Sequence, residues 1–192
     1  MVSLDGYYEG PGGLMDLPFD DAFATYNLER LKTASTVLLG HTSYMMFGGF
    51  WPQVENDPSF SKVDREFSKR YNKVEKVVVS DGPIEPVAAW RDTTRVISDD
   101  VYTAIAKLKR EPGKEIVMWG SHILWNDLLA HRLIDELHFV VGNAVLGDGT
   151  PAFTEPIPAD GQVATLQLLD TLRASPKSDN IIVKYAVKYS NK

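Results

Sequence analysis

Short apolar runs alternate with amphipathic segments through the middle of the chain, and this alternation most constrains the fold. Four runs have the length and composition of strands: residues 36–39, 76–79, 94–97 and 115–119. We expect the first two of these strands to be buried. The segments that separate them have a helical spacing of apolar residues. Continuous apolar runs are typical of parallel strands covered on both faces. The pattern therefore predicts an α/β fold with a mostly parallel central sheet flanked by helices.

The C-terminal part of the chain has a different periodicity. Residues 135–141 and 181–189 alternate between apolar and polar positions. Such alternation is typical of antiparallel strands with one solvated face, so we expect a mixed sheet with antiparallel strands at its C-terminal end. No repeat and no interdomain linker interrupts the sequence, which predicts a single domain over residues 1–192.

Composition excludes several classes of function. The chain has no cysteine, which excludes a disulfide framework, a thiolate zinc site and a cysteine nucleophile. Its four histidines lack ligand spacing, so we expect no metal site. A formal net charge of -6 argues against a nucleic-acid partner. We see no signal peptide and no apolar run of membrane-spanning length, and we expect a cytoplasmic protein without a membrane partner.

Two predicted turns between a strand and a helix contain the residues that hold phosphate in many proteins. Gly40 follows the run 36–39 and precedes hydroxyl side chains, and Gly120-Ser121 follows the run 115–119. Glycine lets a phosphate approach the backbone, and the amides at a helix start stabilise its charge. Ser80, after the run 76–79, is a third candidate. Taken alone, each turn is explained more simply by capping, but together the first two are suited to the two ends of a dinucleotide.

Carboxylates and aromatic residues supply candidates for chemistry. Asp5 interrupts an apolar segment and precedes Gly6, so its charge needs a partner or a ligand. Asp20 belongs to a second group of N-terminal aspartates that are suited either to proton relay or to helix capping. Trp51, beside Phe50, is suited to lining a planar ligand, although core packing is the commoner role of such a pair.

These motifs, taken in order, resemble the C-terminal reductase domain of the bifunctional riboflavin-biosynthesis deaminase–reductase, a group with the dihydrofolate reductase fold. The resemblance covers nearly the whole chain. The matching segments are Ser3-Leu4-Asp5-Gly6-Tyr7, Leu39-Gly40-His41-Thr42-Ser43-Tyr44, Phe50-Trp51-Pro52, Val79-Ser80, Trp119-Gly120-Ser121, Leu133-Ile134-Asp135-Glu136-Leu137 and Val145-Leu146-Gly147-Asp148-Gly149.

The resemblance implies an NADPH-dependent oxidoreductase, often a homodimer, that reduces a small molecule. The reaction of the family is reduction of 5-amino-6-(5-phosphoribosylamino)uracil by hydride transfer. The implied cofactor-binding residues lie along the pyrophosphate and the adenosine, and His41 stands where relatives commonly have arginine. They are Gly40, His41, Thr42, Ser43, Ser80, Trp119, Gly120, Ser121, His122 and Ile123.

For catalysis, the resemblance places Asp5 near the nicotinamide, with Tyr7 and Trp51 at the substrate. Leu17-Pro18-Phe19-Asp20 also resembles the segment of dihydrofolate reductase that contains its pterin-binding acid, which makes Asp20 an alternative proton relay. Two other functions stay open at this point: a reductase of dihydrofolate or pterins, and a non-catalytic nucleotide-binding dimer.

Overall fold

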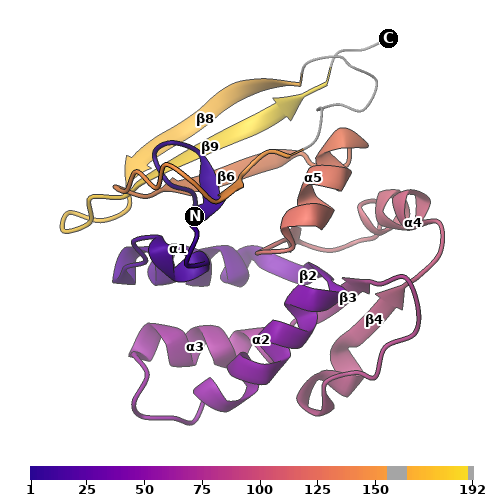
Figure 1. The fold of residues 1–192 in the computed structure, drawn as a ribbon. Coiled ribbons are helices and arrows are strands. Elements are labelled where there is room, and N and C mark those ends of the chain that lie inside the picture. The colour runs from indigo at the N-terminus through magenta and orange to yellow at the C-terminus, as the bar shows by residue number, and fades with distance from the viewer. Residues whose placement is uncertain (155–163, 190–192) are drawn as a thin grey trace. The chain divides into compact units, whose positions relative to one another are not determined.

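The computed structural model describes residues 1–154 and 164–189 (Figure 1). Its contacts divide the chain into two compact units. One unit is Ala24–Leu124, and the other combines Met1–Phe23 with Trp125–Lys192. Each unit has its own sheet, so each is described by itself.

The unit Ala24–Leu124 is built on a four-stranded parallel sheet. The strand order is β4-β3-β2-β5, and every pairing in this sheet is parallel. The strands are β2 (Ala34–Gly40), β3 (Glu75–Val79), β4 (Thr94–Ile97) and β5 (Glu115–Val117). Central positions of β2 and β3 are fully buried, which explains their unbroken apolar sequence. The predicted parallel α/β architecture is confirmed.

Helices connect these strands, as the helical spacing of the intervening segments predicted. The helix that follows β2 runs from His41 to Val54 and includes Pro52. Ser61 caps α3 by accepting a hydrogen bond from the amide of Asp64 at 3.1 Å. Helix α4 starts after Asp100, which has a φ of 43° and makes no side-chain cap bond. The helices are α1 (Asp21–Thr33), α2 (His41–Val54), α3 (Lys62–Tyr71), α4 (Val101–Leu108) and α5 (His122–Ala130), with a 3₁₀ helix at Ala88–Thr93.

The core of this unit is an aromatic cluster that packs on β2 and β3. The rings of Tyr44, Tyr71 and Trp90 are fully buried and meet at tilted or edge-on angles. Lys76 of β3 is buried among them, with its ammonium nitrogen 4.7 Å from the ring centroid of Trp90. That nitrogen donates a hydrogen bond to the carbonyl of Val74 at 2.9 Å. Burial lowers the pKa of Lys76 to about 7.

The other unit contains the antiparallel strands. A three-stranded sheet has the order β6-β9-β8, and β1 pairs with β7 in a separate ribbon. The predicted strands at 135–141 and 181–189 are confirmed, whereas β8 was not singled out from the sequence. The strands are β1 (Tyr7–Glu9), β6 (Glu136–Val141), β7 (Thr150–Pro151), β8 (Thr165–Arg173) and β9 (Ile181–Lys188).

Candidate functional site

The carboxyl edge of the parallel sheet is the first part of the candidate site. Gly40 lies opposite Val79 in the β2–β3 register, and Val79 lies opposite Ile97 in the β3–β4 register. The polar turns that follow these strands therefore emerge along one edge. In open α/β sheets, this edge is where ligands bind.

Hydrogen bonds join the two glycine-containing turns at this edge. The amide of Gly40 donates to the Ser121 hydroxyl at 2.8 Å, and the amide of Ser121 donates to the Ser43 hydroxyl at 2.9 Å. Both serines are buried. Gly120 and Ser121 have positive φ angles of 64° and 55°, which turn the chain sharply before α5. The sequence predicted each turn separately, and the structure makes them direct neighbours.

The start of α2 leaves its backbone uncovered. Gly40 is the N-cap residue in an extended conformation, and no side chain caps the helix there. His41 and Thr42 are exposed. A Cβ added to Gly40 would lie 3.6 Å from the Ser121 hydroxyl, an ordinary contact, so packing alone does not require glycine. Uncapped amides beside a helix dipole suit an anionic group.

The remaining residues predicted to bind the cofactor lie in the same unit, but some of their side chains are buried and others are exposed. Trp119 turns its ring into the aromatic core and donates its indole N–H to Asn27 at 3.0 Å, so only its backbone faces the turn. Ser80 is buried at the end of β3. His122 begins α5, and the next side chain, Ile123, is 84% exposed.

Sequence reasoning missed the residues that follow β4. Ser98, Asp99 and Asp100 leave the sheet at the same edge as Gly40 and Ser80. A polar triplet directly after a predicted strand was the available signal. Asp81 follows β3 in the same way. This part of the edge therefore has carboxylates, which repel phosphate, where a phosphate site would need cations.

Asp5 lies in the other unit, where it binds a loop. Its carboxylate accepts hydrogen bonds from the amides of Leu146 and Gly147, at 3.1 and 2.8 Å. The Ser3 side chain, the Gly147 amide and the Leu146 amide lower the pKa of Asp5 to about 2. Asp5 is therefore ionised at neutral pH. Its predicted place near the nicotinamide stays a prediction.

Asp20 occupies a helix-capping position. One carboxylate oxygen accepts from the amide of Phe23 at 2.8 Å, three residues along the chain, as an N-cap residue does. The other oxygen accepts a short hydrogen bond from the Ser178 hydroxyl. Both oxygens thus have protein partners, and capping accounts for the residue. Its predicted role as a proton relay stays a prediction.

The two residues predicted for the substrate lie in different units. Tyr7 is in β1, half-buried, and its amide donates to the Ser3 hydroxyl at 2.8 Å. Trp51 is in α2, and its ring lies 4.5 Å from that of Phe67 and 6.2 Å from that of Tyr71. Trp51 therefore packs against the aromatic core, the alternative that the sequence left open.

Neither a metal-binding cluster nor a membrane-spanning helix is present in the part of the chain that the structure describes. Within 1–154 and 164–189, no group of three or more histidine or acidic side chains is placed to hold a metal ion. In the same ranges, every helix is too short or too polar to cross a membrane.

Comparison with solved structures defines the class of the protein. The chain matches a putative riboflavin biosynthesis protein from Shewanella sp. PV-4 with a TM-score of 0.68, at 19% identity over 98% of this chain and 96% of that one. It also matches the diaminohydroxyphosphoribosylaminopyrimidine deaminase/5-amino-6-(5-phosphoribosylamino)uracil reductase of Thermotoga maritima, with a TM-score of 0.64 and 14% identity, over 97% of this chain and 54% of that one. The fold is thus the dihydrofolate reductase-like α/β fold.

Sequence comparison narrows this class to one family. The chain belongs to the RibD C-terminal domain family, whose model matches residues 1–177. A curated relative, the uncharacterized protein YyaP of Bacillus subtilis (strain 168), is 30% identical over 156 residues, which make up 80% of this chain and 77% of the relative. The resemblance derived from the motifs is confirmed.

Proposed function

We propose that this protein is an NADPH-dependent reductase that acts on a small heterocyclic substrate, of the kind named for the similar reductase of Thermotoga maritima. The observation that supports this most is the hydrogen-bonded pair of turns, Gly40–Ser43 and Gly120–Ser121, at the carboxyl edge of the parallel sheet. Membership of the RibD C-terminal domain family adds independent support. The absence of cysteine suits a cytoplasmic enzyme, in a reducing compartment.

The residues at this edge fit the pyrophosphate of a dinucleotide. The uncapped start of α2 offers backbone N–H groups, and Gly40 keeps the approach to them free of a side chain. The Ser43 and Ser121 hydroxyls hold the two turns together, so the amides are positioned before a ligand arrives. NADPH, once bound, supplies the hydride.

For the adenosine 2′-phosphate, the fit is weaker. His41 is the candidate cation at the start of α2, while Asp81 and Asp99 follow β3 and β4. An imidazole binds phosphate less strongly than a guanidinium does, and carboxylates repel phosphate. We therefore expect only a small preference for NADPH over NADH.

In the proposed reaction, Asp5 positions rather than donates. Its ionised carboxylate fixes the backbone at Leu146 and Gly147. These two residues, like Asp5, lie in segments that carry the resemblance to the reductase family. Substrate protonation then depends on another donor or on water. This division of roles follows from the pKa of about 2, far below that of a useful acid at neutral pH.

Binding of NADPH to two glycine variants tests the proposal. Gly40→Ala adds a Cβ that the fold accommodates at ordinary contact distances but that covers the helix start. We expect it to weaken NADPH binding at least tenfold by calorimetry, with no loss of thermal stability. Gly49→Ala, in the same helix with open space around its Cβ, is the matched control and should leave binding unchanged.

A second measurement tests the chemistry. Purified protein is mixed with NADPH and either a ribosylaminopyrimidine or dihydrofolate, and NADPH oxidation is followed by absorbance. We expect turnover with the pyrimidine and a lower rate with NADH. No binding of NADPH at millimolar concentration would refute the reductase, and turnover with dihydrofolate alone would transfer the assignment to pterin reduction.

A further inference from the structure

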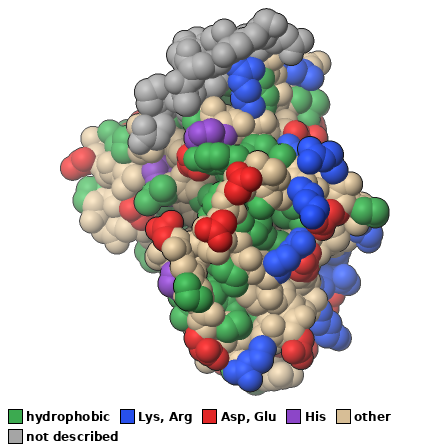
Figure 2. All heavy atoms as spheres, turned by 90° about the vertical axis from the view of Figure 1, so that its right-hand side faces the viewer, with side chains coloured by type: hydrophobic (Ala, Val, Ile, Leu, Met, Phe, Trp, Pro, Cys, Tyr) green, Lys and Arg blue, Asp and Glu red, His purple; other side chains and the backbone are tan. Residues whose placement is uncertain are grey.

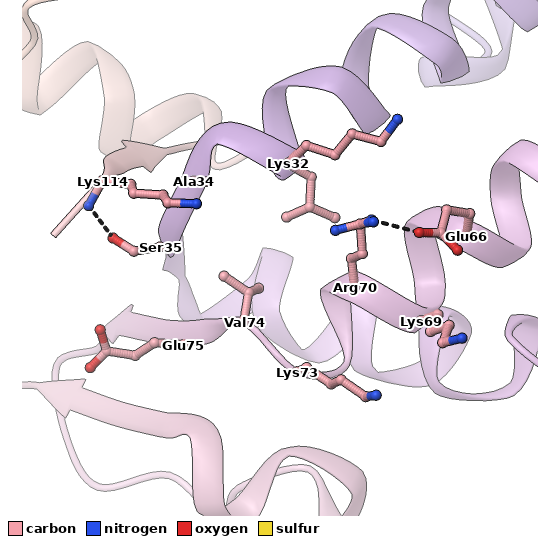
Figure 3. A pocket seen from close by; sticks show the side chains of 11 residues that line it. Lys32, Ala34, Ser35, Glu66, Lys69, Arg70, Lys73, Val74, Glu75 and Lys114 are labelled. Atoms are coloured by element: carbon pink, nitrogen blue, oxygen red, sulfur yellow. Dashed lines mark hydrogen bonds and ion pairs between the residues drawn. The ribbon is translucent and has the colours of Figure 1, made fainter.

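A basic cleft lies at the amino edge of the same parallel sheet, opposite the candidate cofactor edge. It has a volume of about 520 Å³ and lies beside the first residues of β2 and β3, the residue before β5 and the C-terminal turns of α1 and α3 (Figure 3). All of its lining residues belong to the unit Ala24–Leu124. None of them belongs to the proposed cofactor site.

The charge of this cleft is opposite to that of the chain. Five lining side chains are cationic and two are anionic, a formal balance of +3 in a protein whose net charge is -6. The cations are Lys32, Lys69, Arg70, Lys73 and Lys114, and the anions are Glu66 and Glu75.

The partial negative charges of the helix ends do not neutralise the excess positive charge of the cleft. The C-terminal ends of α1 and α3 each present about half a negative charge, so together they offset about one of the three positive charges. Glu75 is turned to other partners, since its carboxylate pairs with Arg95 at 3.3 Å and accepts from the Thr36 hydroxyl at 3.0 Å. The cleft therefore keeps a net positive charge after the helix ends and its own carboxylates are included.

Three of the cations have no carboxylate partner within the described part of the chain: Lys69, Lys73 and Lys114. The other two are paired at the rim, Lys32 with Glu29 and Arg70 with Glu66, each at 2.6 Å. Figure 3 shows Arg70 directed toward Glu66. Exposed pairs of this kind are weak and exchange partners readily. The three unpaired lysines and the two cations of these weak pairs are the positive charges that line the cleft.

On the face drawn in Figure 2, lysine and arginine side chains gather toward one edge, with several acidic side chains among them. A local excess of one sign of charge raises the local concentration of the opposite ion.

We infer that this cleft binds a small polyanion with linked phosphate groups. The volume is in the range of clefts that hold a nucleotide-sized molecule. Several lysines around one space suit a ligand with three or more charges, because each ammonium contributes a separate point charge and hydrogen-bond donor. The Ser35 side chain lies on the same wall, where its oxygen accepts from the amide of Lys114 at 3.0 Å.

The same features disfavour a nucleic acid as the ligand. Duplex binding needs a long basic surface that neutralises many phosphates, whereas this cleft is short and the chain as a whole is acidic. No lining residue is aromatic, so the cleft has no ring on which a base could stack. We therefore expect the phosphate groups, rather than an attached base, to determine affinity.

Calorimetry with inorganic tripolyphosphate tests the cleft in the full chain at low ionic strength. The variant Lys69→Gln/Lys73→Gln/Lys114→Gln removes the three unpaired cations, all on exposed side chains. The control Lys62→Gln/Lys107→Gln/Lys177→Gln removes the same charge from exposed positions outside the cleft. We expect the first variant to weaken binding at least tenfold and the control to change it less than twofold. ATP, titrated in parallel, should bind no more tightly than tripolyphosphate.

Each other outcome would overturn the inference in a distinct way. Equal weakening in both triple variants would mean diffuse attraction to surface charge. Unchanged binding in the cleft variant, together with competition by NADPH, would place the anion at the Gly40 edge. Much tighter binding of ATP would mean recognition of a nucleoside, and no binding by the wild type would leave the cleft without this ligand. NADPH binding, measured separately, decides the proposed reductase independently of all four.

Discussion

At the scale of single residues, Lys76 shows what burial does to a charge. Its side chain is inaccessible to solvent, and its contacts are the Val74 carbonyl, the Thr93 hydroxyl at 3.4 Å and two aromatic faces. No carboxylate is among these partners. Desolvation therefore outweighs the cation–π attraction, and the pKa of Lys76 falls from 10.5 to about 7.

This shift has a defined consequence for stability. Because the folded-state pKa lies below the unfolded one, the unfolded chain holds the extra proton between pH 7 and pH 10.5, and stability rises with pH across that window. We expect Lys76→Met to remove this dependence. The stability difference between wild type and variant should change by about 2 kcal/mol from pH 7 to pH 9, as measured by urea unfolding.

Lys184→Met is the matched control, because Lys184 is paired with Asp170 at 3.1 Å in a partly exposed position. Its stability difference from the wild type should stay nearly constant over the same pH range. A difference for Lys76→Met that is equally constant would mean that the buried amine keeps its ordinary pKa.

At the scale of elements, the success of sequence prediction follows burial. The run 76–79 predicted β3 to within one residue, because a buried parallel strand needs continuous apolar residues. The run 94–97 matches β4 fully, although none of the residues of that edge strand is buried. β8 escaped notice because the strand is exposed along nearly its whole length and its register shifts between Leu168 and Asp170. Neither feature leaves a periodic signal.

In the candidate site, too, the sequence predicted local features but not the contacts between distant segments. The two glycine turns were predictable because strand ends at a parallel sheet's carboxyl edge are the usual ligand positions. The bond from Ser121 to Ser43 spans 78 residues, and that from Gly147 to Asp5 spans 142. Contacts so distant in sequence depend on tertiary packing, which local patterns do not encode.

The loop held by Asp5 gives a prediction for one element. Asp5→Asn leaves a single side-chain oxygen to accept from two amides, so we expect faster hydrogen exchange at Leu146 and Gly147. In the wild type, protonation of Asp5 should have the same effect as the pH falls from about 4 toward 2, because its pKa is lowered in the folded state. Exchange measured by NMR at both amides checks this.

Asp148→Asn provides the control in the same loop, since Asp148 accepts from the amide of its neighbour Gly149 at 2.8 Å and holds neither Leu146 nor Gly147. Exchange at Leu146 and Gly147 should be unchanged in that variant. If Asp5→Asn also leaves both amides protected, Asp5 does not hold the loop and its carboxylate is free for another role.

At the scale of the whole molecule, β8 points to self-association. It is an edge strand of nine residues, and Leu166, Leu168 and Leu169 are each at least 40% exposed. A long edge strand with exposed leucines is a site for pairing with another chain. A second copy presents the same edge, and two-fold pairing would cover both edges at once. We propose that the homodimer that the resemblance implied forms through this strand.

Light scattering after size exclusion tests the dimer. We expect a dimer for the wild type and a dissociation constant at least tenfold higher for Leu168→Lys, because association would bury an unpaired ammonium. Met15→Lys, at a position 82% exposed in the 3₁₀ helix Leu14–Asp16 of the same unit, is the control and should remain dimeric. Thermal unfolding of both variants at low concentration separates lost association from lost folding. A wild-type monomer at all concentrations, or equal dissociation in both variants, would exclude β8 as the interface.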